Sequence, residues 1–129
     1  MDEKDLIFDW NAIDYEIERK SSNHPHDVWF DDETLRDGLQ SPSARNPTID
    51  EKIELIDYME KLGIQKVDLG LPGAGPFHVK HIDSMLTHMS ENSYELRPGC
   101  AVRTVVDDIR PLVDLQAKHE RQIQASAFL

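Results

Sequence analysis

The chain has 129 residues, of which 39% are hydrophobic and 30% charged, and its net charge is −11. This length allows one ordinary hydrophobic core, and the composition is that of a soluble globular protein. No stretch approaches the ~20 apolar residues that a membrane span needs, and the acidic start at Met1–Asp5 does not resemble a signal peptide. The single cysteine, Cys100, cannot form an internal disulfide, so we expect a cytoplasmic protein.

The acidic excess lies entirely in residues 1–60, whereas acids and bases balance in residues 61–129. No basic stripe is present that would neutralise phosphates, which argues against nucleic-acid binding. We attribute the excess to solubility, so recognition of an anionic substrate would depend on local cations.

The predicted elements follow an N-terminal extension, residues 1–27, in which only a short helix near 10–20 is indicated. A first strand is expected at 28–30. The first well-defined helix begins at Thr48, which forms a capping box with Glu51, and ends at Gly63. Its predicted apolar stripe consists of Ile53, Ile56, Met59 and Leu62.

A second strand is expected at 64–71, followed by a turn rich in glycine and proline. The next helix ends near 90–92 and carries an apolar face made of Ile82, Met85, Leu86 and Met89. A third strand at 96–102 is expected to be interrupted at Pro98. The last helix should begin near Asp108, because Pro111 fits a first turn but would break a helix interior. A fourth strand follows at 123–129.

The alternation of four strands with three helices predicts an α/β fold with a parallel sheet. A doubly wound sheet and half of a (β/α)8 barrel both have this order. A complete barrel of that kind needs about 250 residues. Residues 28–129 are therefore predicted to form one domain.

Residues 33–40 carry the clearest chemical pattern, because they follow the first predicted strand directly. They place the Arg36 cation beside the Asp37 carboxylate, with the Gln40 amide shortly after. Such a strand end can hold a divalent metal or the oxygens of a carbonyl substrate. The alternative is a solvated surface charge pair of little energetic worth.

The run from Asp32 to Gln40 resembles the motif that closes the first strand of the metal-dependent acyltransferases and lyases. This family includes 2-isopropylmalate synthase, homocitrate synthase, citramalate synthase and hydroxymethylglutaryl-CoA (HMG-CoA) lyase. The resemblance extends from about Val28 to Leu129. It implies the N-terminal half of a (β/α)8 TIM barrel, an incomplete barrel. It also implies a reaction of amino-acid biosynthesis, the condensation of acetyl-CoA with a 2-keto acid at Mg²⁺, Mn²⁺ or Zn²⁺.

The resemblance assigns a role to each matching residue. Arg36 is the catalytic residue, which stabilises the enolate and contacts the keto-acid oxygens, Asp37 binds the metal, and Gln40 borders the substrate. Asp68 replaces the glutamate that the family has after its second strand, and is expected either to form a polar wall of the substrate pocket or to order the following turn. Arg103 is a candidate for binding a substrate carboxylate or a CoA phosphate; the alternative is an exposed arginine near a helix start.

In this family two further metal ligands form a His-x-His pair on a later strand. His24 and His26 have that spacing but precede the first strand, so we interpret them as coincidental. His78 and His81 are three residues apart on a predicted helix and could share a metal, although a solvated helix face is the simpler interpretation.

Three functions remain open. The first is acetyl-CoA condensation, for which this chain alone is expected to be inactive because later ligands are missing. The second is aldol cleavage of the HMG-CoA lyase type. The third is a non-catalytic fragment or subunit that needs the other half of the barrel. Two unpaired sheet edges and an uncovered barrel interior favour an oligomer, or pairing with a missing half barrel.

Overall fold

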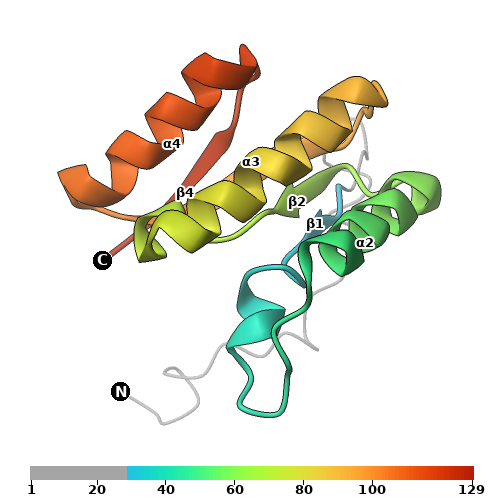
Figure 1. The fold of residues 1–129 in the computed structure, drawn as a ribbon, viewed down its shortest axis with the longest axis horizontal. Coiled ribbons are helices and arrows are strands. Elements are labelled where there is room, and N and C mark those ends of the chain that lie inside the picture. The colour runs from blue at the N-terminus through green and yellow to red at the C-terminus, as the bar shows by residue number, and fades with distance from the viewer. Residues whose placement is uncertain (1–28) are drawn as a thin grey trace, which may run out of the picture.

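The computed structural model describes residues 29–129, which form a four-stranded parallel sheet and three helices (Figure 1). The strands pair in the order β1 (Asp31–Asp32), β2 (Lys66–Asp68), β3 (Arg97–Arg103) and β4 (Gln124–Phe128). Successive strands are connected by α2 (Ile49–Leu62), α3 (Pro76–Glu91) and α4 (Val106–His119). The predicted alternation is therefore confirmed, whereas the helix predicted near 10–20 lies outside the described residues. Within residues 29–129, no helix is both long and apolar enough to cross a membrane.

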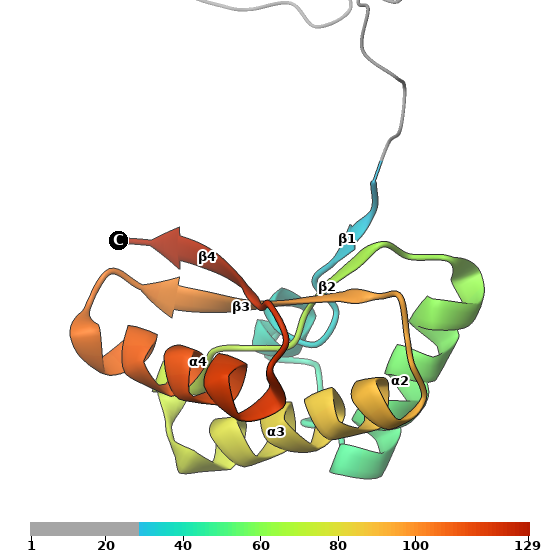
Figure 2. The same cartoon turned by 90° about the horizontal axis from the view of Figure 1, so that it is seen from above.

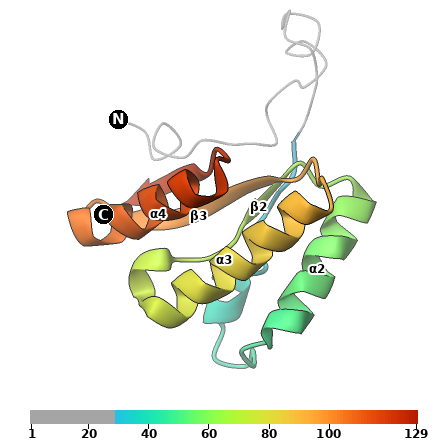
Figure 3. The same cartoon turned by 45° about the horizontal axis from the view of Figure 1, so that its top comes forward.

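All three helices cover the same face of the sheet (Figures 2 and 3). Val67 and Leu69 enter the core beneath these helices. Side chains alternate along a strand, so Asp68, which stands between them, points to the opposite face. No described element lies over that face, and the sheet is not closed within residues 29–129. This is the arrangement of a partial TIM barrel, whose inner face would be the uncovered one, and the predicted fold class is confirmed.

The core lies between the sheet and the helices. The predicted apolar face of α3 is confirmed, because its four residues are at most 1% exposed: Ile82, Met85, Leu86 and Met89. They pack against β2, β3 and α2 residues of the same cluster, including Val67, Cys100 and Ile56. Burial of this kind supplies most of the stability of such a helix.

Both ends of α2 form as the sequence predicts. The Thr48 hydroxyl accepts a hydrogen bond from the Glu51 N–H (3.3 Å), and the Glu51 carboxylate accepts one from the Thr48 N–H (2.8 Å). Gly63 ends the helix with φ of 73°, a left-handed conformation that glycine adopts without steric cost. The predicted apolar stripe extends one turn too far, because Leu62 is 77% exposed while Met59 is buried.

The sheet begins later than predicted at β1 and is continuous at β3. Pairing of β1 starts at Asp31, whose carboxylate accepts a hydrogen bond from the Lys66 ammonium (2.6 Å). The predicted interruption of β3 at Pro98 is wrong. The N–H groups of Arg97 and Ala101 point towards the β2 side of the strand. Successive N–H groups point to opposite sides, so the nitrogen of Pro98 faces β4. Pairing with β4 begins only at Gly99, so the N–H that proline lacks has no partner strand to meet.

The last helix starts two residues earlier than predicted, at Val106, and Pro111 lies inside it. Proline at that position removes the hydrogen bond to the carbonyl of Asp107. Asp107 is exposed, so water can satisfy its carbonyl. The first turn is held instead by Asp108, whose contacts belong to the candidate site.

Candidate active site

The carboxyl ends of β1, β2 and β3 lie at one edge of the sheet, because the strands are parallel. The chain leaves β1 through a short 3-10 turn, η3 (Asp37–Gln40), shown in cyan in Figure 1. Arg36 immediately precedes this turn, and Asp68 ends β2. Two of the predicted site residues are thereby brought together from sequence positions 32 apart.

Arg36 is held by three carboxylates. Its Nε donates to Oε2 of Glu33 (2.7 Å), and its Nη2 lies 2.5 Å from the same oxygen. Its Nη1 lies 3.4 Å from Oδ1 of Asp37, and its Nε lies 3.6 Å from Oδ2 of Asp68. These contacts fix the orientation of the guanidinium. The Arg36 side chain is still 25% exposed, so the guanidinium remains accessible at the rim.

Asp68 is buried, with 3% of its surface exposed. Its Oδ1 accepts a hydrogen bond from the Gly70 N–H (2.9 Å), which orders the turn after β2. Its Oδ2 is buried and has no hydrogen-bond partner among residues 29–129. Burial raises the pKa of Asp68 to about 6; the Glu33 carboxylate adds to this rise, while the Gly70 N–H and Arg36 oppose it. The turn-ordering role is observed, and the second oxygen has only the longer ion pair with Arg36.

Asp37, the predicted metal ligand, begins η3 with its side chain 66% exposed. An exposed carboxylate fits as one oxygen ligand of a divalent cation. In the part of the chain that the structure describes, no three His, Cys, Asp or Glu residues are grouped so that they could hold a metal ion. The described residues therefore fit part of a metal site and do not complete one. Gln40, also exposed, ends the same turn.

Arg103 ends β3 and is engaged by Asp108. The Asp108 carboxylate accepts from the Arg103 backbone N–H (3.0 Å), from Nε (2.7 Å) and from Nη2 (2.7 Å). These hydrogen bonds hold the pKa of Asp108 below its usual range. Asp108 is 1% exposed, whereas the Arg103 side chain is 53% exposed. The structure thus places Arg103 at the carboxyl end of β3, paired with Asp108 and still half exposed.

Gly73 lies so close to the Asp108 carboxylate that one added methyl group at Gly73 would disturb the hydrogen bonds of Asp108. Gly73 lies in a 3-10 turn, η4 (Pro72–Ala74), and a Cβ built on it would collide with the Asp108 carboxylate. We expect Gly73→Ala to lower the free energy of unfolding by roughly 1–3 kcal/mol, the usual cost of overpacking. Gly38→Ala is the matched control, because a Cβ at Gly38 meets only ordinary contacts at 3.7 Å or more. Urea denaturation measures both, and equal effects would contradict the proposed contact.

The sequence pattern of the family described as HMGL-like matches residues 27–126. The chain belongs to the HMGL-like family. This confirms the family resemblance that the motif from Asp32 to Gln40 indicates.

Curated relatives of this HMGL-like chain are bacterial 2-isopropylmalate synthases. The enzyme of Crocosphaera subtropica is 40% identical over 89 residues, which covers 69% of this chain and 16% of the relative. The enzyme of Campylobacter hominis is 35% identical over 79 residues, covering 61% and 15%. The enzyme of Listeria monocytogenes is 39% identical over 66 residues, covering 49% and 13%. The HMGL-like chain therefore spans 13 to 16% of the length of these relatives.

The residues predicted from the sequence do not include two that orient site residues, nor a buried lysine nearby on α2. Glu33 orients Arg36, Asp108 orients Arg103, and Lys52 lies buried on the inner face of α2. Lys52 was detectable, because it is spaced four and seven residues from the buried Ile56 and Met59. Nothing in the local sequence shows that Asp108 turns back to Arg103.

Of the remaining candidate groups, His78 and His81 line a pocket together with Arg36 and Gln40, and the others do not join this edge. His24 and His26 lie outside the described residues. The Nε2–H of His88 donates a hydrogen bond to the Asp57 carboxylate (2.7 Å), and that of His119 donates one to Asp83 (2.8 Å). Cys100 is fully buried, and burial raises the pKa of its thiol, which disfavours the nucleophilic thiolate.

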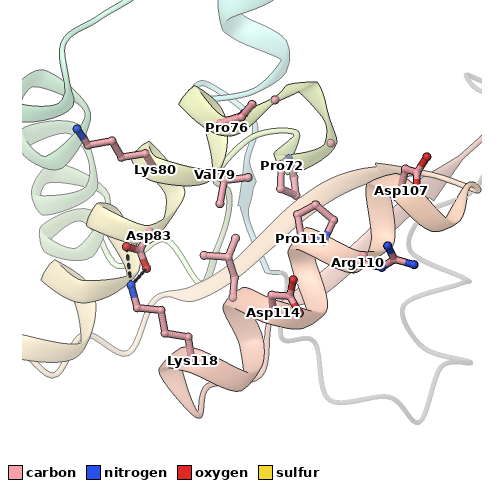
Figure 4. Close-up of a pocket in the computed structure, with 13 residues that line it drawn as sticks. Pro72, Pro76, Val79, Lys80, Asp83, Asp107, Arg110, Pro111, Asp114 and Lys118 are labelled. Carbon is pink, nitrogen blue, oxygen red and sulfur yellow. Dashed lines mark hydrogen bonds and ion pairs between the residues drawn. The ribbon is translucent and has the colours of Figure 1, made fainter.

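A separate groove of about 670 Å³ lies between α3 and α4 on the helical side of the sheet (Figure 4). The ion pair of Lys118 with Asp83 (2.7 Å) closes one end of it. None of the predicted site residues lines this groove. The groove is therefore not part of the candidate active site.

Proposed function

We propose that this chain contributes the first strands of a metal-dependent acyltransferase site that joins acetyl-CoA to a 2-keto acid. The observation that carries the proposal is Arg36, fixed by Glu33 3.6 Å from the buried carboxylate of Asp68 at the ends of β1 and β2. Membership of the HMGL-like family and the 2-isopropylmalate synthase relatives support it. Aldol cleavage of the HMG-CoA lyase type would use the same Arg36, but the relatives' names favour condensation.

Arg36 stabilises the negative charge that develops on the acetyl-CoA carbonyl oxygen when the methyl group loses a proton. A cation that is already oriented costs no reorganisation when this charge appears. Asp68 and Gln40 border the keto acid, and the free N–H groups of Arg103 bind its carboxylate or a CoA phosphate. All four residues are proposed to face one substrate from the rim of the barrel.

A divalent metal, when bound, would polarise the carbonyl of the keto acid. Asp37 would supply one oxygen ligand, and Mg²⁺, Mn²⁺ and Zn²⁺ all accept a carboxylate. Further ligands are proposed to come from outside residues 29–129, in a paired half barrel or another part of a longer protein. The chain alone is therefore expected to show no acetyl-CoA turnover.

The proposal is tested in a chimera in which residues 27–126 replace the matching segment of the Crocosphaera subtropica enzyme. We expect the folded chimera to release CoA from acetyl-CoA only when a 2-keto acid is present. Asp37→Asn should weaken the apparent metal affinity by at least about tenfold, since an oxygen ligand loses its charge. Thiol release measured against Mn²⁺ concentration reports both effects.

Asp114→Asn is the matched control for that experiment, because Asp114 is an exposed carboxylate on α4 that is not proposed to contact the metal or the substrate. It should leave the metal dependence unchanged. A folded chimera with no turnover, or an Asp37→Asn chimera with the parent metal dependence, would contradict the proposed function.

A further inference from the structure

A pocket of about 300 Å³ lies on the helical side of the sheet, behind the candidate active site. It is enclosed by η3, the loop that follows it, α2, the end of β2 and α3. Its apolar lining includes the buried side chains of Leu35, Leu69 and Ile82. Leu69 faces this pocket from the sheet, so Asp68 beside it points to the other face. The pocket therefore lies on the other side of the sheet from Asp68, although Arg36 and Gln40 at the sheet edge also line it.

The polar lining of this pocket contains no carboxylate, although the whole chain carries a net charge of −11. Its polar members are Arg36, Gln40, Asn46, Lys52, His78 and His81. The Arg36 guanidinium is already paired with Glu33. The unmatched positive charge in the pocket is thus that of Lys52.

Lys52 is 4% exposed, an unusual environment for a lysine. No hydrogen bond or ion pair joins its ammonium group to another residue within 29–129, and burial lowers its pKa. An ammonium with so little contact with water and no counter-charge is costly to the folded protein. An anion in the pocket would remove that cost.

His81 adds a second unmatched polar group in the same pocket. Its Nδ1 is buried and has no hydrogen-bond partner among the described residues. Its ring packs against Phe77, with 4.1 Å between ring centroids. Burial and the nearby Lys52 charge lower the pKa of His81, so the imidazole is neutral at pH 7 and can donate a hydrogen bond from one ring nitrogen.

We propose that this pocket binds a small organic monocarboxylate, with its carboxylate on Lys52 and His81 and its aliphatic part on Leu35, Leu69 and Ile82. One ammonium charge and a neutral imidazole match a single negative charge. A phosphate dianion would leave an excess charge in an apolar surrounding. The inference does not depend on the proposed function, because it is argued from Lys52 and His81, to which the proposed function gives no role.

The test uses the full chain and three probes: isovalerate, its neutral amide isovaleramide, and inorganic phosphate. We expect isovalerate alone to shift the imidazole NMR signals of His81 and His78 saturably, with a Kd on the order of 1 mM for so small a ligand. The signals of His88 and His119 should not move, because both rings are paired with aspartates elsewhere. Binding of isovalerate should also raise the titration midpoint of His81.

Lys52→Met keeps the length of the side chain and removes its charge, and we expect it to weaken isovalerate binding at least about tenfold. This variant should fold at least as well as the parent, because it removes a charge that has no counter-charge from a nearly buried side chain. Lys61→Met, at the exposed end of the same helix, is the matched control and should bind as the parent does. Equal binding of isovaleramide, tighter binding of phosphate, or full binding by Lys52→Met would overturn the proposal.

Discussion

Replacing Arg36 with glutamine in the chimera is expected to lower kcat by a factor on the order of 10² to 10³. This is the usual cost of removing one oriented group that stabilises charge in the transition state. KM for the keto acid should change much less, because the stabilised charge appears only after the methyl group of acetyl-CoA begins to lose its proton. Steady-state thiol release at saturating metal measures both constants.

Two further variants separate the chemical role of Arg36 from its structural one. Arg36→Lys keeps the charge but cannot make the two contacts to Glu33, so an intermediate rate is expected. Arg45→Gln removes an exposed arginine that pairs with Glu51, and its rate should equal that of the parent chimera. Circular dichroism establishes that each variant is folded. A folded Arg36→Gln chimera with the parent kcat would show that Arg36 has no part in catalysis.

Much of the fold could be predicted from the sequence because its signals are local. The capping box at Thr48, the glycine at Gly63 and the apolar face of α3 each depend on residues within one or two helical turns. The errors occur where tertiary contacts override a local rule. Pro98 is tolerated in β3 because its nitrogen faces a side where pairing has not yet begun. Pro111 is tolerated in α4, where the carbonyl it leaves free belongs to an exposed residue.

The sequence predicts the residues of the candidate site only where they belong to one short motif. Arg36 and Asp37 are neighbours in sequence, so the motif finds both. The approach of Arg36 to Asp68 depends on the pairing of β1 with β2. The pairing of Arg103 with Asp108 depends on the turn into α4. These distances are properties of the sheet and its connections, and no spacing in the sequence encodes them.

The folding stability of the protein is expected to depend on pH through the buried carboxyl group of Asp68. Its pKa is near 3.8 in an unfolded chain and about 6 in the folded one, with burial as the main cause. Between about pH 4 and pH 6 the folded protein therefore binds more protons at this site than the unfolded chain. Folding stability from this group is lost as the pH rises through that range. At pH 7 the ionised, buried carboxylate is expected to cost on the order of 3 kcal/mol.

Asp68→Asn should therefore raise the free energy of unfolding at pH 7 by on the order of 3 kcal/mol, because the amide imitates the protonated acid and keeps the acceptor for Gly70. The difference from the parent should shrink towards zero below about pH 4. Urea denaturation of both proteins between pH 4 and pH 7.5 measures it, and Asp114→Asn, on an exposed face of α4, is the control. If Asp68→Asn were less stable than the parent at pH 7, attraction to Arg36 would outweigh burial. The carboxylate would then be held ionised for the substrate at every pH in that range.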